Sequence, residues 1–461
     1  MNIICSEAGS PPECGKLSSE QNSRVIRRIY TACLLYAIGE TLFTNSFMLL
    51  YLAQLGVPSE RILLYLALPV FVSIFALILF AQWIEQLNKI LIGVIGLGLG
   101  TLSMIILIAV GFLPLPLVEP LIVLSMLLYG IGFGMYLDCW FPMLSTVIPQ
   151  AARGRFFGNN RLIYQTGTIA FTFIVTWLLA RDSSLIVFQS CFAVVVLLRI
   201  VGIAMFAKVP DLEKRRPCIG PGLLHSLSQV ISQQSYLAFC AYVFLLSLFT
   251  GACPSIFSLL AKDTLKMTAG QVMLIGNLTT MGALVGFFLG GRLVDRLGTK
   301  YVFMGCHFSF ALILVLFLFR DFMLLSLLGI IGTLALLFGL IQASSGVAVS
   351  AEMLAAIPDD NKAMATAVNL ALMYLGVSLS GIFSSQMLKM EMLSHSWQMF
   401  GSRMGPYDAL LLICGVMVLI LVVTLGLVPS VLKKNNQRQN HTVLRSPDHG
   451  RQALRSQIAD Q

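Results

Sequence analysis

Long uninterrupted runs of hydrophobic residues alternate with short polar stretches along most of the chain. Twelve runs reach about 20 residues, the length at which an α-helix crosses a lipid bilayer. They cover residues 28–53, 61–81, 90–112, 118–145, 157–180, 185–207, 235–260, 270–291, 301–319, 322–350, 364–388 and 406–430. A helix satisfies its backbone hydrogen bonds within its own segment, as the interior of a bilayer requires. The pattern therefore predicts twelve transmembrane helices.

The composition supports this interpretation. Hydrophobic residues make up 57% of the chain and charged residues 11%, and the mean hydropathy is +0.87. This leaves too little polar surface to cover a water-soluble globule of this size. We expect an all-α polytopic membrane protein in contact with the lipid bilayer. The longest polar segments, residues 1–27, 208–234 and 431–461, are too short for a second folded domain of ordinary size.

The distribution of basic residues predicts the orientation. Most of the 30 Lys and Arg residues lie in the loops on the side of the N-terminus, whereas the opposite loops carry few, among them Arg61, Arg181 and Arg320. Cytoplasmic loops are the ones enriched in Lys and Arg, so both termini should face the cytoplasm. We expect a multi-pass protein of the cell membrane, or of the inner membrane in a bacterium.

The formal charge of +9 needs no nucleic-acid partner, because the excess lies where it meets anionic lipid. Binding of RNA by the basic tail is a weaker alternative. The tail has almost no apolar periodicity, so residues 431–461 are predicted to be disordered.

Two matches at nearly one offset indicate an internal duplication. Tyr36 and a Leu-Phe-Thr motif ending at Thr44 recur as Tyr242 and a Leu-Phe-Thr motif ending at Thr250. The segment 81–89 is a degenerate copy of 291–299. The duplication predicts two six-helix bundles, residues 28–207 and 235–430, with a substrate path between them. The link 208–234 is long enough to let the bundles rock.

A charged hairpin between two apolar runs carries a family resemblance. Residues 290–300 read Gly-Gly-Arg-Leu-Val-Asp-Arg-Leu-Gly-Thr-Lys. This segment resembles the signature loop of the major facilitator superfamily, and the matching residues are Gly291, Leu293, Asp295, Arg296, Gly298 and Lys300. The resemblance implies two pseudo-symmetric six-helix bundles and secondary transport of solutes.

The first copy of the hairpin departs from the family pattern. Ala81, Glu85, Gln86 and Asn88 stand where family members have Gly, Asp, Arg and Gly. In the family this loop is thought to latch the inward-closed arrangement, with a carboxylate capping a helix end. By this resemblance Asp295 and Arg296 would carry the gating role here. The alternative is that both residues only hold the hairpin and set the topology.

Charges inside the apolar runs are the main functional lead, because an ionisable group at bilayer depth is costly unless it faces a cavity or a partner. Glu40 lies near the middle of the first run, with Tyr36 and Thr44 on the same helical face. The repeat offset places Leu246 in the equivalent position of the second half. We interpret Glu40 as a single proton-coupling site. The alternative is a carboxylate that only hydrogen-bonds to a neighbouring helix.

Asp138 and Arg161 lie in the cytoplasmic halves of neighbouring antiparallel runs. An ion pair between them would neutralise two costly charges, so we predict a structural pair, with contact to substrate as the alternative. Arg199 is near enough to the inner interface for its guanidinium to reach lipid phosphates, and it receives no role.

Uncharged polar residues complete the predicted substrate cavity. These candidates are Asn45, Tyr164, Asn277, Gln342, Asn369 and Tyr374, besides Tyr36 and Thr44. Amides also join helices in membranes, so each candidate has a structural alternative. His307 is interpreted as a core histidine. The spacing of Gly282, Gly286 and Gly290 predicts close approach of a neighbouring helix.

The sequence contains no Gly-x-x-x-x-Gly-Lys-Ser/Thr, His-Glu-x-x-His or Gly-x-Ser-x-Gly enzyme motif. The first 25 residues have no apolar core, so no cleavable secretory signal is expected. The ten cysteines show no paired metal spacing and lie mostly in apolar runs. We expect no cofactor, no metal and no enzymatic activity.

These observations lead to one hypothesis with two alternatives. The chain is interpreted as a monomeric secondary transporter that moves a small organic solute by alternating access, coupled to protons. A proton-independent facilitator on the same fold is the first alternative. A membrane receptor or lipid translocator without solute flux is the second.

Overall fold

The computed structural model describes residues 19–44, 46–81, 88–148, 153–210, 223–322, 326–356, 362–390, 397–399 and 402–426. The first half contains α1 (Ser19–Thr44), α2 (Ser46–Gln54), α3 (Ser59–Ala81), α4 (Lys89–Val110), α5 (Leu115–Val147), α6 (Arg153–Arg181) and α7 (Leu185–Phe206). The short helix α8 (Leu223–Ile231) follows. The predicted disordered tail, 431–461, lies outside the described residues.

The second half begins with α9 (Gln234–Thr250), α10 (Cys253–Leu259) and the π-helical turn η2 (Leu260–Thr264). It continues with α11 (Ala269–Leu297), α12 (Thr299–Leu316), the 3-10 helix η3 (Phe317–Phe322), α13 (Leu327–Ala356) and α14 (Lys362–Lys389). The antiparallel pair β1 (Trp397–Met399) and β2 (Ser402–Met404) precedes α15 (Pro406–Leu421) and the π-helical turn η5 (Val422–Gly426).

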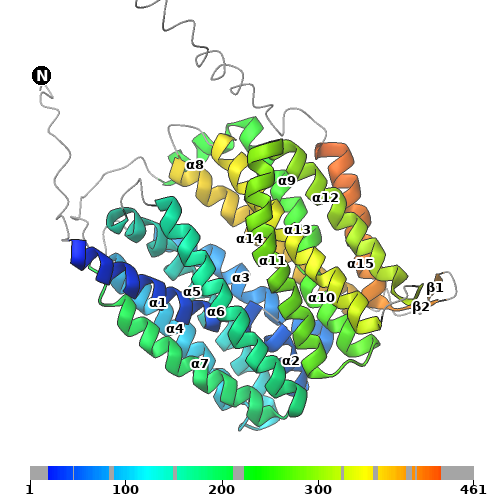
Figure 1. Ribbon diagram of the computed structural model, residues 1–461. Helices are drawn as coiled ribbons and strands as arrows, with labels where there is room; N and C mark the ends of the chain where they lie inside the picture. Colours follow the sequence, from blue (N-terminus) through cyan, green and yellow to red (C-terminus); the bar gives the residue numbers. More distant parts are fainter. Residues whose placement is uncertain are drawn as a thin grey trace, which may run out of the picture.

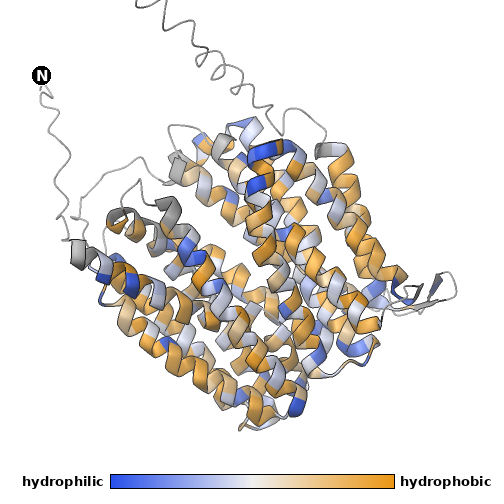
Figure 2. Ribbon diagram, in the orientation of Figure 1, coloured by the Kyte–Doolittle hydropathy of each residue, from blue (hydrophilic) through white to orange (hydrophobic). Residues whose placement is uncertain are grey.

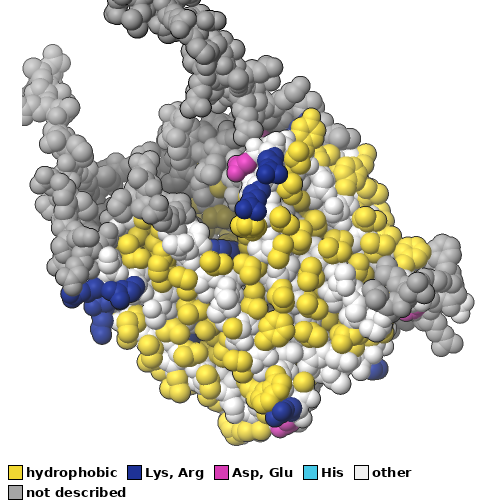
Figure 3. Space-filling model, in the orientation of Figure 1, with side chains coloured by type: hydrophobic (Ala, Val, Ile, Leu, Met, Phe, Trp, Pro, Cys, Tyr) yellow, Lys and Arg dark blue, Asp and Glu magenta, His cyan; other side chains and the backbone are white. Residues whose placement is uncertain are grey.

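The predicted transmembrane helices are present. Within the described residues, eleven helical segments are long and apolar enough to cross a membrane, and the bent pair α1 and α2 makes a twelfth. The surface agrees, since hydrophobic side chains cover most of the described face in Figure 3 and hydrophobic ribbon predominates in Figure 2. Large apolar side chains such as Phe75, Ile174 and Leu312 are more than half exposed. Such a surface suits lipid and would favour aggregation in water.

The first helix of each half is broken at equivalent places. The first predicted run bends by 54° between α1 and α2, and the seventh is interrupted between α9 and α10. Both breaks follow the repeated Leu-Phe-Thr motif, directly after Thr44 and Thr250. Pro254 stands in the first turn of α10, where its missing N–H costs no helical hydrogen bond. The shared position of the breaks supports the predicted duplication.

The two halves are separate helical bundles. Most of the contact between them is made by two helix pairs. In the first half α4 packs on α5 and α7, and α1 packs on α6 and α7. In the second half α11 packs on α13, and α9 packs on α14. Between the halves, α3 packs on α14 and α6 packs on α11. Figure 1 shows the halves side by side, diverging toward the end that carries α8 and the start of α1. We call this end the linker end and the opposite end, with Ser59 and the β1–β2 hairpin, the far end.

Small residues allow the closest contact between α11 and α13, as their spacing predicts. A Cβ atom added to Gly286 would lie 2.9 Å from Leu340 Cα, and one added to Gly290 would lie 2.7 Å from Ser344 Cα. Both distances are below van der Waals contact, so no larger residue fits without moving a helix. The prediction of close helix approach is confirmed.

We expect Gly286→Ala to lower the free energy of unfolding by about 1–3 kcal/mol, because the methyl group overpacks this contact. Unfolding of the purified protein by denaturant in mixed micelles would measure the change. Gly305→Ala in α12 is the matched control, since no atom lies within 4 Å of the added Cβ. Equal effects of the two substitutions would contradict the packing argument.

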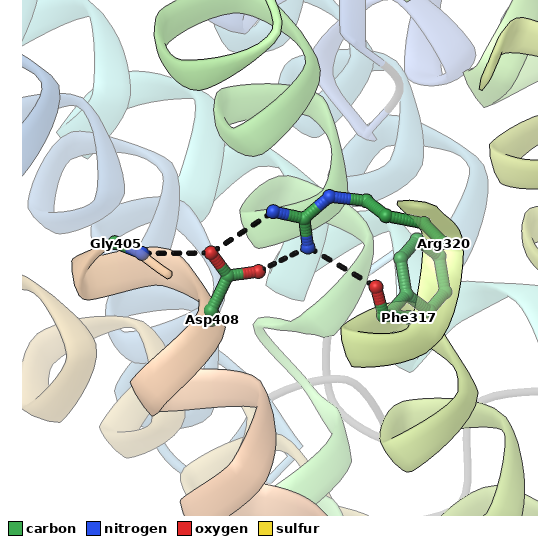
Figure 4. A network of polar contacts seen from close by, with 4 residues as sticks. All are labelled: Phe317, Arg320, Gly405 and Asp408. Atoms are coloured by element: carbon green, nitrogen blue, oxygen red, sulfur yellow. Dashed lines mark hydrogen bonds and ion pairs between the residues drawn. The ribbon is translucent and has the colours of Figure 1, made fainter. Parts of the chain in front are cut away.

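A buried ion pair anchors α15 to the end of α12. Arg320 and Asp408 are 2% and 0% exposed. The two terminal guanidinium nitrogens of Arg320 donate to the two carboxylate oxygens of Asp408 (Figure 4). The carboxylate also accepts a hydrogen bond of 2.8 Å from the Gly405 N–H, and Arg320 donates to the Phe317 carbonyl. The sequence pattern places Arg320 in an outer loop. The structure places it at the far end, in η3, with its side chain folded inward against α15.

Candidate functional site

A cavity of about 460 Å³ lies between the two halves. Residues of α1, α2 and α6 line one side, and residues of α10, α11, α13 and the α9–α10 break line the other. Its polar lining consists of Glu40, Thr41, Thr44, Ser46, Arg161, Tyr164, Gln165, Thr168, Ser255, Ser258, Thr279, Thr280 and Gln342. This size and polarity suit a small organic molecule.

The helix breaks shape the cavity. Thr44 and Ser46 flank the break between α1 and α2, and Gly251 and Pro254 flank the break between α9 and α10. The two broken segments touch, because the hydroxyl groups of Ser46 and Ser258 lie 2.9 Å apart. Irregular backbone at membrane depth is tolerated where it is buried in protein or lines a cavity. The duplicated motif thus builds both halves of one site.

Glu40 lies in the cavity wall and is partly exposed to it. The two cations that act on its carboxyl group electrostatically are Arg199 and Arg161. Within the described residues no cation lies close enough to Glu40 to form an ion pair. A carboxyl group at membrane depth that faces a cavity without a fixed partner is a candidate functional group.

Arg161 stacks across the interface between the halves. Its guanidinium carbon lies 3.6 Å from the centroid of the Phe287 ring in α11 and 5.3 Å from that of Tyr164. Its Nε and one oxygen of Asp138 are both buried without a hydrogen-bond partner. The two side chains form no ion pair, so the predicted pair is wrong. Sequence neighbours in antiparallel helices need not face each other, and here Arg161 turns toward the second half.

Arg199 is buried inside the first half and does not reach the lipid surface. It is 3% exposed, and its Nε donates a 3.2 Å hydrogen bond to the Thr101 hydroxyl. Its guanidinium lies over the Tyr36 ring at 5.1 Å. The absence of a side chain at Gly39 and Gly100 makes this space, since a Cβ at either position would clash with the guanidinium. The expected contact with lipid phosphates is therefore wrong.

The remaining predicted cavity residues divide into two groups. Thr44, Tyr164 and Gln342 line the cavity with Glu40 and Arg161. Tyr36, Asp138, Asn277, Asn369 and Tyr374 are not in its lining, and Asn45 lies outside the described residues.

Four of these five, all except Asp138, make other contacts. Tyr36 packs against Tyr136 with the rings tilted and 4.3 Å between their centroids. Asn277 donates to the Thr176 hydroxyl at 2.7 Å, and Asn369 donates to Cys240 Sγ at 3.5 Å. Tyr374 packs its ring against Phe133 of the other half. The amides therefore follow the structural alternative and join helices.

Sequence reasoning missed several hydroxyl groups of the lining. Thr168 lies three residues after Gln165 on α6, and Thr279, Thr280 and Ala283 lie at helical spacing after Gly276 on α11. These stripes of small polar residues are a detectable periodic signal. Isolated Ser and Thr residues are common in membrane helices, so single positions carried little information.

His307 is a core histidine, as interpreted from the sequence. It is fully buried, with Nδ1 2.9 Å from the Tyr242 hydroxyl and Nε2 2.8 Å from Ser345 Oγ. Both ring nitrogens therefore have partners away from the cavity.

The predicted gating hairpin is a sharp turn at the linker end. Helix α11 extends to Leu297, and Gly298, with φ of +88°, joins it directly to α12. That φ favours glycine. Asp295 and Arg296 are exposed, and within the described residues neither forms an ion pair. The other signature positions, Gly291 and Lys300, are partly exposed.

Hydrogen bonds between the halves cluster toward the far end. Ser59 at the start of α3 donates to Asp263 Oδ2 of η2 at 2.7 Å, and within the second half Tyr407 of α15 donates to the same oxygen at 2.5 Å. Ser378 of α14 donates to the Ala67 carbonyl at 3.2 Å. The halves are thus joined beyond the cavity on the far side and diverge on the linker side (Figure 1).

Comparisons with known proteins agree with this architecture. The sequence model of the Major Facilitator Superfamily matches residues 237–458. The structure is similar to the nucleoside transporter NupG, with a TM-score of 0.64 and 13% identity over 88% of this chain and 98% of that one. It is similar to a D-xylose-proton symporter, with a TM-score of 0.62 and 16% identity over 86% and 97%.

A bacterial homologue of the iron transporter ferroportin in an inward-facing state gives a TM-score of 0.61 and 12% identity over 88% of this chain and 99% of that one. A comparison with curated protein sequences found no match. The second half of the chain, residues 237–458, therefore matches the Major Facilitator Superfamily by sequence, and the chain as a whole has the fold of these membrane transporters.

Proposed function

We propose that the protein is a secondary active transporter that moves a small organic solute by alternating access and couples this movement to protons through Glu40. The observation that carries the proposal is the position of Glu40, in the wall of a polar cavity that both halves line. A carboxyl group in this place changes its charge with the proton concentration on the side to which the cavity opens.

The asymmetry of the contacts between the halves supports alternating access. Hydrogen bonds join the halves at the far end, while the halves diverge at the linker end. With both termini in the cytoplasm, as the basic loops predict, this arrangement is the inward-facing one. In the outward-facing arrangement the Ser59–Asp263 contact would break, and the hairpin with Asp295 and Arg296 would close.

Distances between spin labels test this motion. One pair of labels at Ser183 and Lys389 spans the far end, and another at Lys208 and Leu297 spans the linker end; all four positions lie at the ends of helices. We expect a solute gradient or a pH change to lengthen the first distance and shorten the second. If both distances stay constant, or change in the same direction, alternating access is contradicted.

We expect Asp263→Asn to shift the population toward the outward-facing arrangement, because the carboxylate accepts a hydrogen bond from Ser59 of the first half across this end. Hydrogen bonds to a charged group are worth about 1.5–3 kcal/mol, so the population ratio should change by roughly 10- to 150-fold. The far-end label pair measures the shift. Asp321→Asn, an exposed carboxylate near the same end, is the control and should leave the distances unchanged.

The substrate can be sought by the thermal stability of the purified protein in the presence of panels of metabolites and drugs, followed by uptake of the best compound into proteoliposomes. Vesicles that take up none of the stabilising compounds, but move labelled lipid, would instead support a lipid translocator.

A further inference from the structure

The charges around the cavity favour an anion. Within the described residues, Glu40 and Arg161 are the acidic and basic side chains of the lining, and Arg199 acts on Glu40 from behind the wall. The region therefore holds two guanidinium groups for one carboxyl group. When Glu40 is ionised one positive charge is uncompensated, and when Glu40 is protonated two are. A cationic solute would be repelled in both cases.

Arg161 lines the cavity, and its guanidinium is stacked on an aromatic ring of the second half. Phe287 stacks on its guanidinium at 3.6 Å and Tyr164 lies beside it, so aromatic rings occupy the region around the planar group. Its Nε–H has no hydrogen-bond partner, and within the described residues no carboxylate pairs with the guanidinium. A guanidinium edge binds a carboxylate through two parallel hydrogen bonds. A buried donor without a partner marks a place where a ligand atom would be stabilised.

The rest of the lining suits hydroxyl groups on the ligand. Gln165 and Thr168 of α6 face Thr279, Thr280 and Gln342 of the second half across the cavity. The amides donate and accept hydrogen bonds, whereas the three threonine hydroxyls donate to carbonyls of their own helices and offer their lone pairs as acceptors. None of these groups carries a charge. They can hold the hydroxylated body of a small molecule whose charged group lies on Arg161.

On the basis of the proposed proton-coupled transport, we propose that the solute is a small hydroxylated monocarboxylate, bound through its carboxylate to Arg161 while Glu40 carries the proton. In this scheme one O–H bond forms on Glu40 at one side of the membrane and breaks at the other. One anion and one proton cross together, so no net charge moves. Proton binding to Glu40 removes the negative charge that competes for Arg161, and each ligand thereby strengthens the binding of the other.

Matched probes test the charge preference. D-gluconate, D-gluconamide and glucamine share a hydroxylated chain and carry an anionic, a neutral and a cationic end group. Binding is measured on the purified full-length protein by calorimetry, together with lactate and glycerate as shorter anions. We expect at least one carboxylate to bind about 10- to 100-fold more tightly than its amide, and the amine to bind least. Affinity for the anion should rise as the pH falls, because protonation of Glu40 removes the negative charge that opposes the anion.

Three variants separate recognition from folding. Arg161→Gln should remove the preference for carboxylate over amide, and Arg161→Lys should retain part of it, because lysine keeps the charge without the planar fork. Arg292→Gln is the matched control, since Arg292 also stacks on a phenylalanine, Phe288, at 3.9 Å but lies exposed outside the cavity. Melting temperatures without ligand show whether each variant is folded.

Glu40→Gln tests the coupling. It mimics the protonated carboxyl group, so it should keep tight binding of the anion and lose its pH dependence. Loss of binding in this variant, together with a preference for amino acids over hydroxy acids, would mean that ionised Glu40 holds an ammonium group, and would overturn the proposal. Equal binding of carboxylates and amides, or anion binding unchanged by Arg161→Gln, would overturn it as well.

These results separate the two levels of proposal. Proton-driven uptake of a neutral solute would refute the carboxylate while leaving the proton-coupled transporter intact. Selective binding of the anion without proton movement in proteoliposomes would uphold the anion site and refute the coupling.

Discussion

Glu40→Gln should abolish the proton-driven accumulation of solute while leaving exchange of solute across the membrane intact. With one proton per solute, a gradient of one pH unit supports an accumulation ratio of about ten, since 1.4 kcal/mol corresponds to a factor of ten. Without a titratable group at this position the ratio should fall to about one. Uptake of the best-binding compound into proteoliposomes, with a pH-sensitive dye inside, measures both fluxes.

The control for this experiment is Glu119→Gln. Glu119 pairs with Arg61 at the far end, where their side chains are 42% and 48% exposed, so its substitution should leave the accumulation ratio unchanged. An undiminished ratio in Glu40→Gln would contradict coupling through Glu40. Solute movement that ignores the pH gradient in the unmodified protein would favour the proton-independent facilitator.

Asp408→Asn should destabilise the second half by about 3–5 kcal/mol, because it leaves the Arg320 guanidinium buried without a counter-charge. The same residue accepts the Gly405 N–H, so the start of α15 also loses a charged acceptor. Unfolding by denaturant in mixed micelles measures the free energy. The double substitution of Arg320→Met with Asp408→Leu should recover most of the loss, since it removes both charges together.

The exposed pair of Arg61 and Glu119 is the comparison for the buried pair. Breaking it with Glu119→Gln should cost less than about 1 kcal/mol, because water already solvates both groups. If the two carboxylate substitutions cost the same, burial would not explain the strength of the pair at Arg320. A double variant less stable than either single variant would contradict the desolvation argument.

The hydrophobic pattern was sufficient to predict the helices because membrane insertion depends on the length and polarity of one continuous segment. The repeated motifs at Thr44 and Thr250 also revealed the two halves. The same motifs gave no sign that the helix breaks directly after each of them. These breaks depend on what the segment packs against, as in the contact of Ser46 with Ser258 across the halves.

The candidate site was predictable only in part. Glu40 was found from its depth, because a carboxyl group in the middle of an apolar run is costly wherever it points. Depth says nothing about the direction of a side chain around the helix axis. For this reason Arg161 and Asp138 were wrongly paired, and Arg199 was wrongly assigned to the lipid interface. Thr168 and Thr279 were missed because a hydroxyl group costs little free energy in a membrane helix and therefore occurs on any face of it.

The amino-acid sequence by itself determined the membrane environment, the apolar helices and the resemblance to the family, because each of these rests on local composition or on order along the chain. The tertiary structure alone decided which polar groups meet. Gly39 and Gly100 leave room for Arg199, and the approach of α11 to α6 brings Phe287 onto Arg161. Such contacts join residues far apart in the chain, and the energy of a buried charge depends on the partners that the fold brings to it.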